Sequence, residues 1–238
     1  MDTPLLSVQN LQLIRHTGGL GAGGMVYRVS LESLELAPAQ VVAITGPSGC
    51  GKSTLIEGLG LILRPASLGS YVLRGQEIAP WVTGNTVQWR LGSLRSRYLG
   101  IVPQVGGLLP YLTVAQNITL PIRMLGQPVQ SQWIEGLAGQ LGLGNLLSRY
   151  PQELSIGQRQ RASLLRALAH RPDILLADEP TAALDPENAR QLVELMIGFS
   201  SQFGTAVVLV THEWSLVETF GIDRLQAKSL GPSHMGFA

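Results

Sequence analysis

The chain has 238 residues, of which 45% are hydrophobic and 14% charged, so its composition is that of a globular protein and excludes a disordered one. The formal net charge of +1 gives no electrostatic reason to expect a nucleic-acid partner. The only cysteine, Cys50, excludes an internal disulfide framework and a metal site built from cysteines.

Two segments near the N-terminus, 5–14 and 25–36, alternate apolar and polar residues, and this period predicts the two strands of an antiparallel hairpin. The connecting segment contains Gly19, Gly21 and Gly24 at the spacing of a dinucleotide-binding fingerprint. Because a strand-like segment rather than a helix follows them, we interpret these glycines as part of a flexible loop. The start of the chain lacks a basic region followed by a long apolar stretch, so we predict no signal peptide.

The next feature is an apolar run at 41–44, followed by a glycine-rich turn and a helical stretch at 53–63. In this context the pattern G-x-x-x-x-G-K-[ST] forms a phosphate-binding loop. Its glycines let main-chain N–H groups surround phosphate oxygens, while Lys52 can reach the β- and γ-phosphates and the Ser53 hydroxyl can ligate Mg²⁺. The sequence therefore predicts a nucleoside triphosphate site formed by Gly46, Pro47, Ser48, Gly49, Cys50, Gly51, Lys52, Ser53 and Thr54.

Between residues 98 and 134 the only charged residue is Arg123. The part at 98–122 has no charged residue, and an uncharged stretch of this length raises the question of a membrane span. Pro103, Pro110 and Pro121 would break a continuous helix in lipid, so we predict that the chain is soluble. Two interpretations of the stretch stay open, namely a buried subdomain and an apolar groove that receives a short helix of a membrane partner.

Three further apolar runs, at 99–102, 174–177 and 206–210, have the composition of strands buried on both faces. Helical stretches at 158–170 and 188–203 lie between them. This alternation predicts an α/β fold with a mainly parallel sheet. The middle of the chain has no strand pattern after residue 102, which predicts an inserted helical subdomain. We expect a single domain, with a nucleotide-binding core at 1–92 and 166–238 and the helical subdomain at 93–165.

Polar side chains follow several of the predicted strands. The strand at 174–177 ends in Asp178, which can hold the water shell of Mg²⁺, and Glu179, which can polarise an attacking water. Gln104 follows the strand at 99–102, and His212 follows the strand at 206–210. Upstream, the sequence Leu-Ser-Ile-Gly-Gln at 154–158 opens a helix whose N-terminus can bind an anion.

This set of motifs, in this order, resembles the ATP-binding cassette proteins, the ATPase subunits of ABC transporters. The segment 46–54 is similar to the Walker A loop, 154–158 to the signature motif, 174–178 to Walker B and 182–185 to the D-loop. The resemblance implies a P-loop fold, hydrolysis of ATP with Mg²⁺, and a head-to-tail homodimer. It also implies roles for the following residues: catalysis by Glu179 and His212, nucleotide binding by Gln104, Ser155, Gly157 and Gln158, and metal binding by Ser53, Gln104 and Asp178.

The sequence departs from the family pattern at three places. Ile156 replaces the first glycine of the signature pair, and we expect it to face away from the nucleotide. Ala182 stands where the D-loop usually has serine. The aromatic residue expected to stack on adenine is replaced by Arg15 or His16, and of these the Arg15 guanidinium could stack on the base.

Within the family, the stretches 94–104 and 108–121 look most like the lipoprotein-release and macrolide-export ATPases. This likeness implies an ATPase that powers export or extraction through a separate transmembrane permease, with a periplasmic adaptor as a further partner. The expected location is the cytoplasmic face of the inner membrane. The alternative is a mechanical switch acting on a membrane complex without transport, as in the related cell-division ATPase. A cassette acting on nucleic acid is disfavoured by the neutral charge and the single-cassette length.

Two further expectations concern residues with chemistry of their own. The tryptophans Trp81, Trp89, Trp133 and Trp214 are not interleaved with basic residues, so we predict packing in the core or at its edge rather than base stacking. Cys50 lies next to a helix N-terminus and close to Lys52, surroundings that favour a thiolate. We therefore expect the thiol to be reactive in the absence of nucleotide, and the alternative is a side chain that is turned into the sheet, buried and inert.

Overall fold

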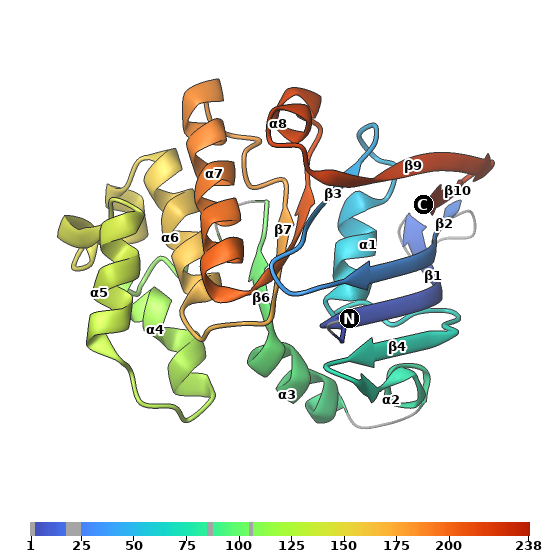
Figure 1. Ribbon diagram of the computed structural model, residues 1–238, viewed down its shortest axis with the longest axis horizontal. Coiled ribbons are helices and arrows are strands. Elements are labelled where there is room, and N and C mark those ends of the chain that lie inside the picture. Colours follow the sequence, from blue (N-terminus) through green and yellow to red (C-terminus); the bar gives the residue numbers. More distant parts are fainter. Residues whose placement is uncertain (1–2, 18–24, 85–87, 105–106) are drawn as a thin grey trace.

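The computed structural model describes all residues except 1–2, 18–24, 85–87 and 105–106 (Figure 1). The predicted loop with Gly19, Gly21 and Gly24 lies outside the described residues. The strands run in the order β5-β4-β1-β2-β10-β9-β3-β8-β7-β6 within one sheet. Their bounds are β1 Leu6–Thr17, β2 Met25–Leu36, β3 Val41–Thr45, β4 Ser70–Leu73, β5 Gln76–Glu77, β6 Leu99–Val102, β7 Ile174–Asp178, β8 Ala206–Val210, β9 Asp223–Gly231 and β10 His234–Phe237.

Helices occupy both sides of the parallel half of this sheet (Figure 1). Their bounds are α1 Lys52–Leu59, α2 Ala79–Thr83, α3 Gln88–Tyr98, α4 Val114–Met124, α5 Ser131–Gln140, α6 Ile156–Leu168, α7 Pro186–Phe203 and α8 Trp214–Thr219. Short 3₁₀ turns occur at Gly144–Leu146 and Pro151–Glu153. The α/β fold with an inserted helical subdomain is confirmed.

The helix that follows the phosphate loop is shorter than predicted. It ends at Leu59 instead of continuing to residue 63, because Leu61 has a left-handed φ of 56° that cannot continue an α-helix. Helices α6 and α7 begin at residues 156 and 186 and not at the predicted 158 and 188, because the side chains of Ser155 and Asp185 cap them.

The parallel half of the sheet pairs β9, β3, β8, β7 and β6 in register, and its predicted strands are confirmed. All five residues of β8 are buried, as are the four apolar residues of β7. This explains why these strands read as continuous apolar runs. Parallel strands have their carboxyl ends at one edge, so the segments that follow β3, β6, β7 and β8 meet there.

The other half of the sheet is an antiparallel layer that contains β1, β2, β4 and β5. The predicted N-terminal hairpin is confirmed. β1 pairs with β2 from Leu6 opposite Leu36 to Thr17 opposite Met25. Helix α1 lies between this layer and the parallel strands, with contacts to β1, β2, β7 and β8. Leu13, Val29 and Leu55 are buried where the layers meet, so the helix that follows the phosphate loop is held from both sides.

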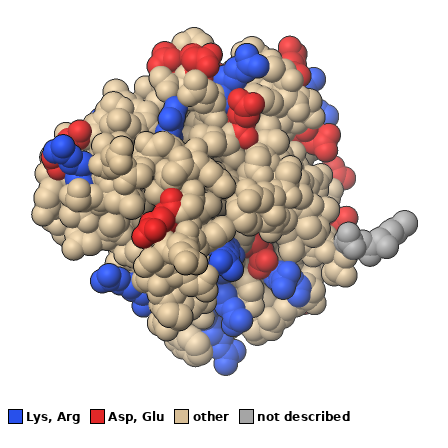
Figure 2. Space-filling view, turned by 60° about the vertical axis from the view of Figure 1, so that its left-hand side comes forward, with Lys and Arg blue, Asp and Glu red and all other residues tan. Residues whose placement is uncertain are grey.

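The segment between β6 and β7 has no described strand and contains α4, α5 and α6, which form a second apolar core together with α7. Figure 2 shows the side of the molecule that carries these helices. Uncharged residues cover most of it, and Lys and Arg gather in its lower part. Within the described ranges, no helix combines the length and the apolar character needed to cross a membrane.

The prediction for the tryptophans is confirmed for Trp133 and wrong for Trp89. Trp133 packs edge-on against Phe203 with ring centroids 4.8 Å apart, and its Nε1–H donates to the carbonyl of Ala169. Trp89 is 64% exposed on α3, with the Arg90 guanidinium over its ring. Its exposure follows from the polar character of α3, in which only part of the helix surface meets the core.

Candidate nucleotide site

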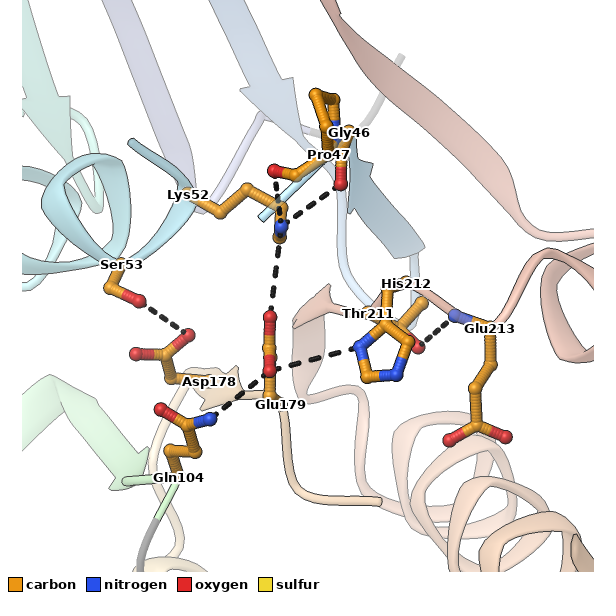
Figure 3. Close-up of polar contacts among 10 residues, drawn as sticks. All are labelled: Gly46, Pro47, Lys52, Ser53, Gln104, Asp178, Glu179, Thr211, His212 and Glu213. Atoms are coloured by element: carbon orange, nitrogen blue, oxygen red, sulfur yellow. Dashed lines mark hydrogen bonds and ion pairs between the residues drawn. The ribbon is translucent and has the colours of Figure 1, made fainter. Parts of the chain in front are cut away.

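The phosphate loop connects the end of β3 to the start of α1, as predicted from its glycines. Gly51 has a φ of 95°, and a Cβ there would lie 2.4 Å from Cγ2 of Val29, so both the backbone angle and the space require glycine. Lys52 is 4% exposed, and its Nζ donates to the main-chain oxygens of Gly46 (2.9 Å) and Pro47 (3.0 Å). The ammonium is therefore held inside the loop, where a phosphate would lie (Figure 3).

Four chain segments bring polar side chains to the edge of the sheet next to this loop (Figure 3). The Ser53 hydroxyl at the start of α1 donates to Oδ1 of Asp178 at the end of β7, over 3.1 Å. Lys52 Nζ lies 3.6 Å from Oε1 of Glu179. These contacts bring Asp178 and Glu179 next to the phosphate loop.

Glu179 is the centre of the cluster. Nε2 of Gln104 donates to its Oε2 over 3.1 Å, and Nδ1 of His212 lies 3.7 Å from the same oxygen. The Glu179 side chain is 16% exposed, and its backbone has a left-handed φ of 45°, which is rare for a residue with a side chain. Strained backbone of this kind is found at functional sites, where it fixes the direction of a side chain.

The position of His212 depends on a neighbour that the sequence analysis did not single out. Thr211 is buried, its N–H donates to the carbonyl of Ile44 on β3, and its Oγ1 accepts from the N–H of Glu213. This turn directs the His212 ring toward Glu179 (Figure 3). A threonine directly after a buried strand is the sequence signal for such a turn.

The two adjacent acids differ in their surroundings. Burial raises the pKa of Asp178, the hydrogen bond from Ser53 lowers it, and the negative charge of Glu179 raises it further. A bound cation would reverse this effect, because it would favour the ionised carboxylate.

The expectation of a reactive thiolate at Cys50 is wrong. The residue is 5% exposed and belongs to the apolar core under the phosphate loop. Burial raises the pKa of the thiol, and this effect outweighs the opposing influence of Lys52. The sequence correctly placed a cation near the cysteine but could not show that the side chain turns into the core.

Ser155 caps α6 in the way that the signature motif predicts for a helix N-terminus. Its Oγ accepts from the N–H of Gln158, and Oε1 of Gln158 accepts from the N–H of Ser155, which forms a capping box. Gln158 therefore has a local structural contact, and its predicted contact with nucleotide stays a prediction. Ile156 is 49% exposed, which agrees with a side chain directed away from the helix packing.

The signature segment is not part of the polar cluster. Among the residues that the structure describes, no hydrogen bond or ion pair joins Ser155 or Gly157 to Lys52, Asp178 or Glu179. The space beside Gly157 is occupied by side chains of Leu184 and Asn188 instead.

At the predicted adenine position, Arg15 forms an ion pair with Glu57 of α1, and His16 is exposed. The guanidinium is 43% exposed in this pair. Stacking of either residue on adenine stays a prediction.

The donor set of the cluster fits Mg²⁺. Within the described part of the chain, no group of three or more His, Cys, Asp and Glu side chains could hold a metal ion alone. The Ser53 hydroxyl and the Asp178 carboxylate instead offer adjacent hard oxygens, and Gln104 can add its amide oxygen. Mg²⁺ is held in this way at nucleotide sites, by one or two protein oxygens together with phosphates and water.

Comparison with known proteins places this arrangement in a family. The family model described as "ABC transporter" matches residues 30–182. The lipoprotein-releasing system ATP-binding protein LolD of Idiomarina loihiensis is 38% identical over 185 residues, which cover 77% of this chain and 78% of LolD. The methionine import ATP-binding protein MetN of Cupriavidus necator is 37% identical over 200 residues, so that the chain spans 56% of the length of MetN.

Solved structures agree with the fold. The ATP-binding cassette MJ0796, a dimer in a post-hydrolysis state with ADP and Pi, superposes with a TM-score of 0.72 at 26% identity and 89% coverage of both chains. The cassette cbiO1 from Clostridium perfringens shares the fold with a TM-score of 0.75 at 22% identity, over 100% of this chain and 88% of its own. The chain belongs to the ABC transporter family, and within that family it is an ATPase subunit.

Proposed function

We propose that Glu179 activates the water that attacks the γ-phosphate of ATP. The observation that carries this proposal is the convergence of Lys52, Gln104 and His212 on one carboxylate, which would then face both the phosphate and its counter-charges. A carboxylate in this position accepts the proton of the attacking water. The backbone strain at Glu179 supports a directed side chain.

The other residues of the cluster have distinct proposed roles. Lys52 exchanges its contacts with the loop carbonyls and with Glu179 for phosphate oxygens, and it neutralises charge that develops in the transition state. His212 donates a hydrogen bond to the γ-phosphate. When bound through Ser53, Asp178 and Gln104, Mg²⁺ supplies further neutralisation of the phosphate charges.

We propose that two copies of the chain pair head to tail. The phosphate loop and the signature belong to different parts of the chain, with no described contact between Ser155 and the Glu179 cluster. A second copy would bring its Ser155 and Gly157 to the nucleotide held by the first. The dimeric structure of MJ0796 with ADP and Pi supports this arrangement.

A groove between α3, β6, α4 and α6 is the proposed docking place of a transmembrane permease. Its lining combines apolar side chains with polar ones, and they are Leu99, Ile101, Leu120, Pro121 and Met124 together with Arg95, Arg166 and His170. Met124 is 73% exposed, so its side chain is accessible to a partner at this groove. A short helix of the permease would cover it.

The transport step is proposed to be extraction or export of a substrate. LolD supports this direction, since its name describes lipoprotein release and the match spans 78% of its length. MetN is named for import, so the two relatives differ in direction. A mechanical switch without transport is the alternative. The comparisons give no support for a periplasmic adaptor, and we include none.

Binding to a permease would place the protein at the cytoplasmic face of the inner membrane.

We propose that two parts of the chain move relative to each other during the ATPase cycle. They are the predicted nucleotide-binding core at 1–92 and 166–238 and the predicted helical subdomain at 93–165. Helices α3 and α6 cross these boundaries without a break, so a pivot would involve the loops that flank them.

The experiment that tests this function is co-purification from mild detergent with identification of the bound membrane protein. A polytopic permease encoded beside this chain should be recovered with the native protein and lost with Met124→Glu. Leu230→Glu is the matched control, because Leu230 is also exposed (58%) but lies on β9, away from the groove. Recovery of the same permease with Met124→Glu would exclude the groove as the docking place.

A further inference from the structure

Helix α6 carries a buried glutamine whose contact reaches the metal side of the site. Gln160 is 3% exposed, and its Nε2 donates over 3.1 Å to the main-chain oxygen of Gln104. The two residues are 56 positions apart in the chain. The Gln104 side chain in turn points to Glu179 (Figure 3).

The second polar atom of this amide has no partner among the residues that the structure describes. Oε1 of Gln160 is buried and accepts no hydrogen bond from the described residues. An unsatisfied buried acceptor is destabilising, and methionine or leucine would fill the same space without that cost. The amide therefore has no advantage for packing, and its one visible contact is the hydrogen bond to Gln104.

The rest of α6 is fixed against β6, the strand that leads to Gln104. A Cβ at Gly100 would lie 2.4 Å from the carbonyl oxygen of Ala167, so the helix backbone is in close contact with the strand. Six residues after Gln160 on the same helix, Nη1 of Arg166 donates to the carbonyl of Gly107. Side chains of α6 thus hold the main chain at Gln104 and again at Gly107.

We propose that Gln160 is a positioning residue, which fixes the main chain of Gln104 so that the Gln104 amide reaches the metal ion and Glu179. The inference rests on the proposed role of Gln104 as a metal ligand. Gln160 and Ser155 lie on the same helix, so this hydrogen bond also joins the signature end of α6 to the metal side of the site.

The test measures how much Mg²⁺ strengthens ATP binding, using the full chain with Gln160→Met. The ratio of the ATP dissociation constants in EDTA and in Mg²⁺ should fall about fivefold, the effect of one lost hydrogen bond. The dissociation constant in EDTA should stay unchanged, because the phosphate loop is intact. Turnover at saturating Mg²⁺ should fall by a similar factor, with little change in KM.

Three further variants make the result decisive. Gln104→Ala should lower the ratio at least as much as Gln160→Met. Ser163→Ala is the matched control, because Ser163 is also buried on α6 and its hydroxyl has no described partner. Gln160→Leu repeats the test with a second apolar side chain in case the methionine variant does not fold.

The outcomes separate the inference from the proposal on which it rests. A normal ratio for folded Gln160→Met beside a lowered ratio for Gln104→Ala would overturn the inference and leave the role of Gln104 intact. A normal ratio for Gln104→Ala would overturn both. An equal loss in Ser163→Ala would show that the helix packing, and not the hydrogen bond, determines the effect.

Discussion

Replacing Glu179 by glutamine removes one negative charge from the centre of the site and keeps the size of the side chain. The carboxylate faces the Lys52 ammonium at 3.6 Å, and both side chains are largely buried. Coulomb's law at this separation gives about 1 kcal/mol in water and about 5 kcal/mol at the effective dielectric constant of a protein surface. Lys52 must leave this pair to bind phosphate, so the pair competes with ATP.

The substitution should therefore change binding and hydrolysis in opposite directions. ATP should bind at least about fivefold more tightly to Glu179→Gln, because even the lower electrostatic figure corresponds to that factor. Hydrolysis should fall by about 10²–10⁴-fold, since the group that accepts the proton of water is lost. Loss of ATP binding together with hydrolysis would show that Glu179 has a structural role.

The assay combines an equilibrium titration of a fluorescent ATP analogue with single-turnover phosphate release. Glu213→Gln is the matched control, because Glu213 is a nearby acid whose carboxylate points away from the cluster (Figure 3). The control should leave both quantities unchanged. Turnover of Glu179→Gln above about a tenth of the native rate would refute the reasoning, since it lies outside the range for a lost general base.

Four other variants or treatments test the remaining parts of the structure. Lys52→Ala should lose most ATP binding in the same titration, because the buried ammonium is the main positive charge of the phosphate loop. Cys50 should be alkylated slowly, with and without Mg²⁺-ATP, because the thiol is buried and its pKa is raised; rapid labelling of the folded protein would contradict this. Gly100→Val should lower the stability by about 1–3 kcal/mol in urea unfolding, because a side chain would press on the Ala167 carbonyl. Burial raises the pKa of Asp178, so the folded state binds this proton more tightly than the unfolded state and stability falls as pH rises above the ordinary carboxyl range. Asp178→Asn should accordingly raise the urea midpoint at pH 7 without nucleotide, and the gain should vanish at acid pH.

The parts of the fold that depend on short segments could be predicted from the sequence. The strands at 99–102, 174–177 and 206–210 were visible because a strand buried on both faces has no polar position. The phosphate loop was visible because its glycines and lysine are adjacent in the chain. Helix ends were less accurate: α1 ends at Leu59, with Gly60 as its C-cap and a left-handed backbone angle at Leu61, whereas the prediction continued to residue 63.

The site could be predicted as a set of residues but not as an arrangement. The order of motifs placed Gln104, Glu179 and His212 at strand ends, and parallel strands bring such ends together. The contact between Gln160 and Gln104 joins residues far apart in the chain, so no local pattern indicates it. Cys50 was misjudged because its charged neighbour is a sequence property, whereas its burial depends on packing with the β1–β2 layer.

The polar groups of the site satisfy one another. Lys52 contacts two loop carbonyls and Glu179, Ser53 donates to Asp178, and Gln104 donates to Glu179. Binding of ATP must therefore exchange these contacts for phosphate and metal contacts, and the net affinity is the difference between the two sets. In the proposed mechanism Lys52 leaves Glu179 in that exchange, so the carboxylate becomes free to act on the attacking water when the phosphate loop is filled. The same carboxylate thus pairs with the lysine of the phosphate loop and, in the proposed mechanism, acts on the bound nucleotide.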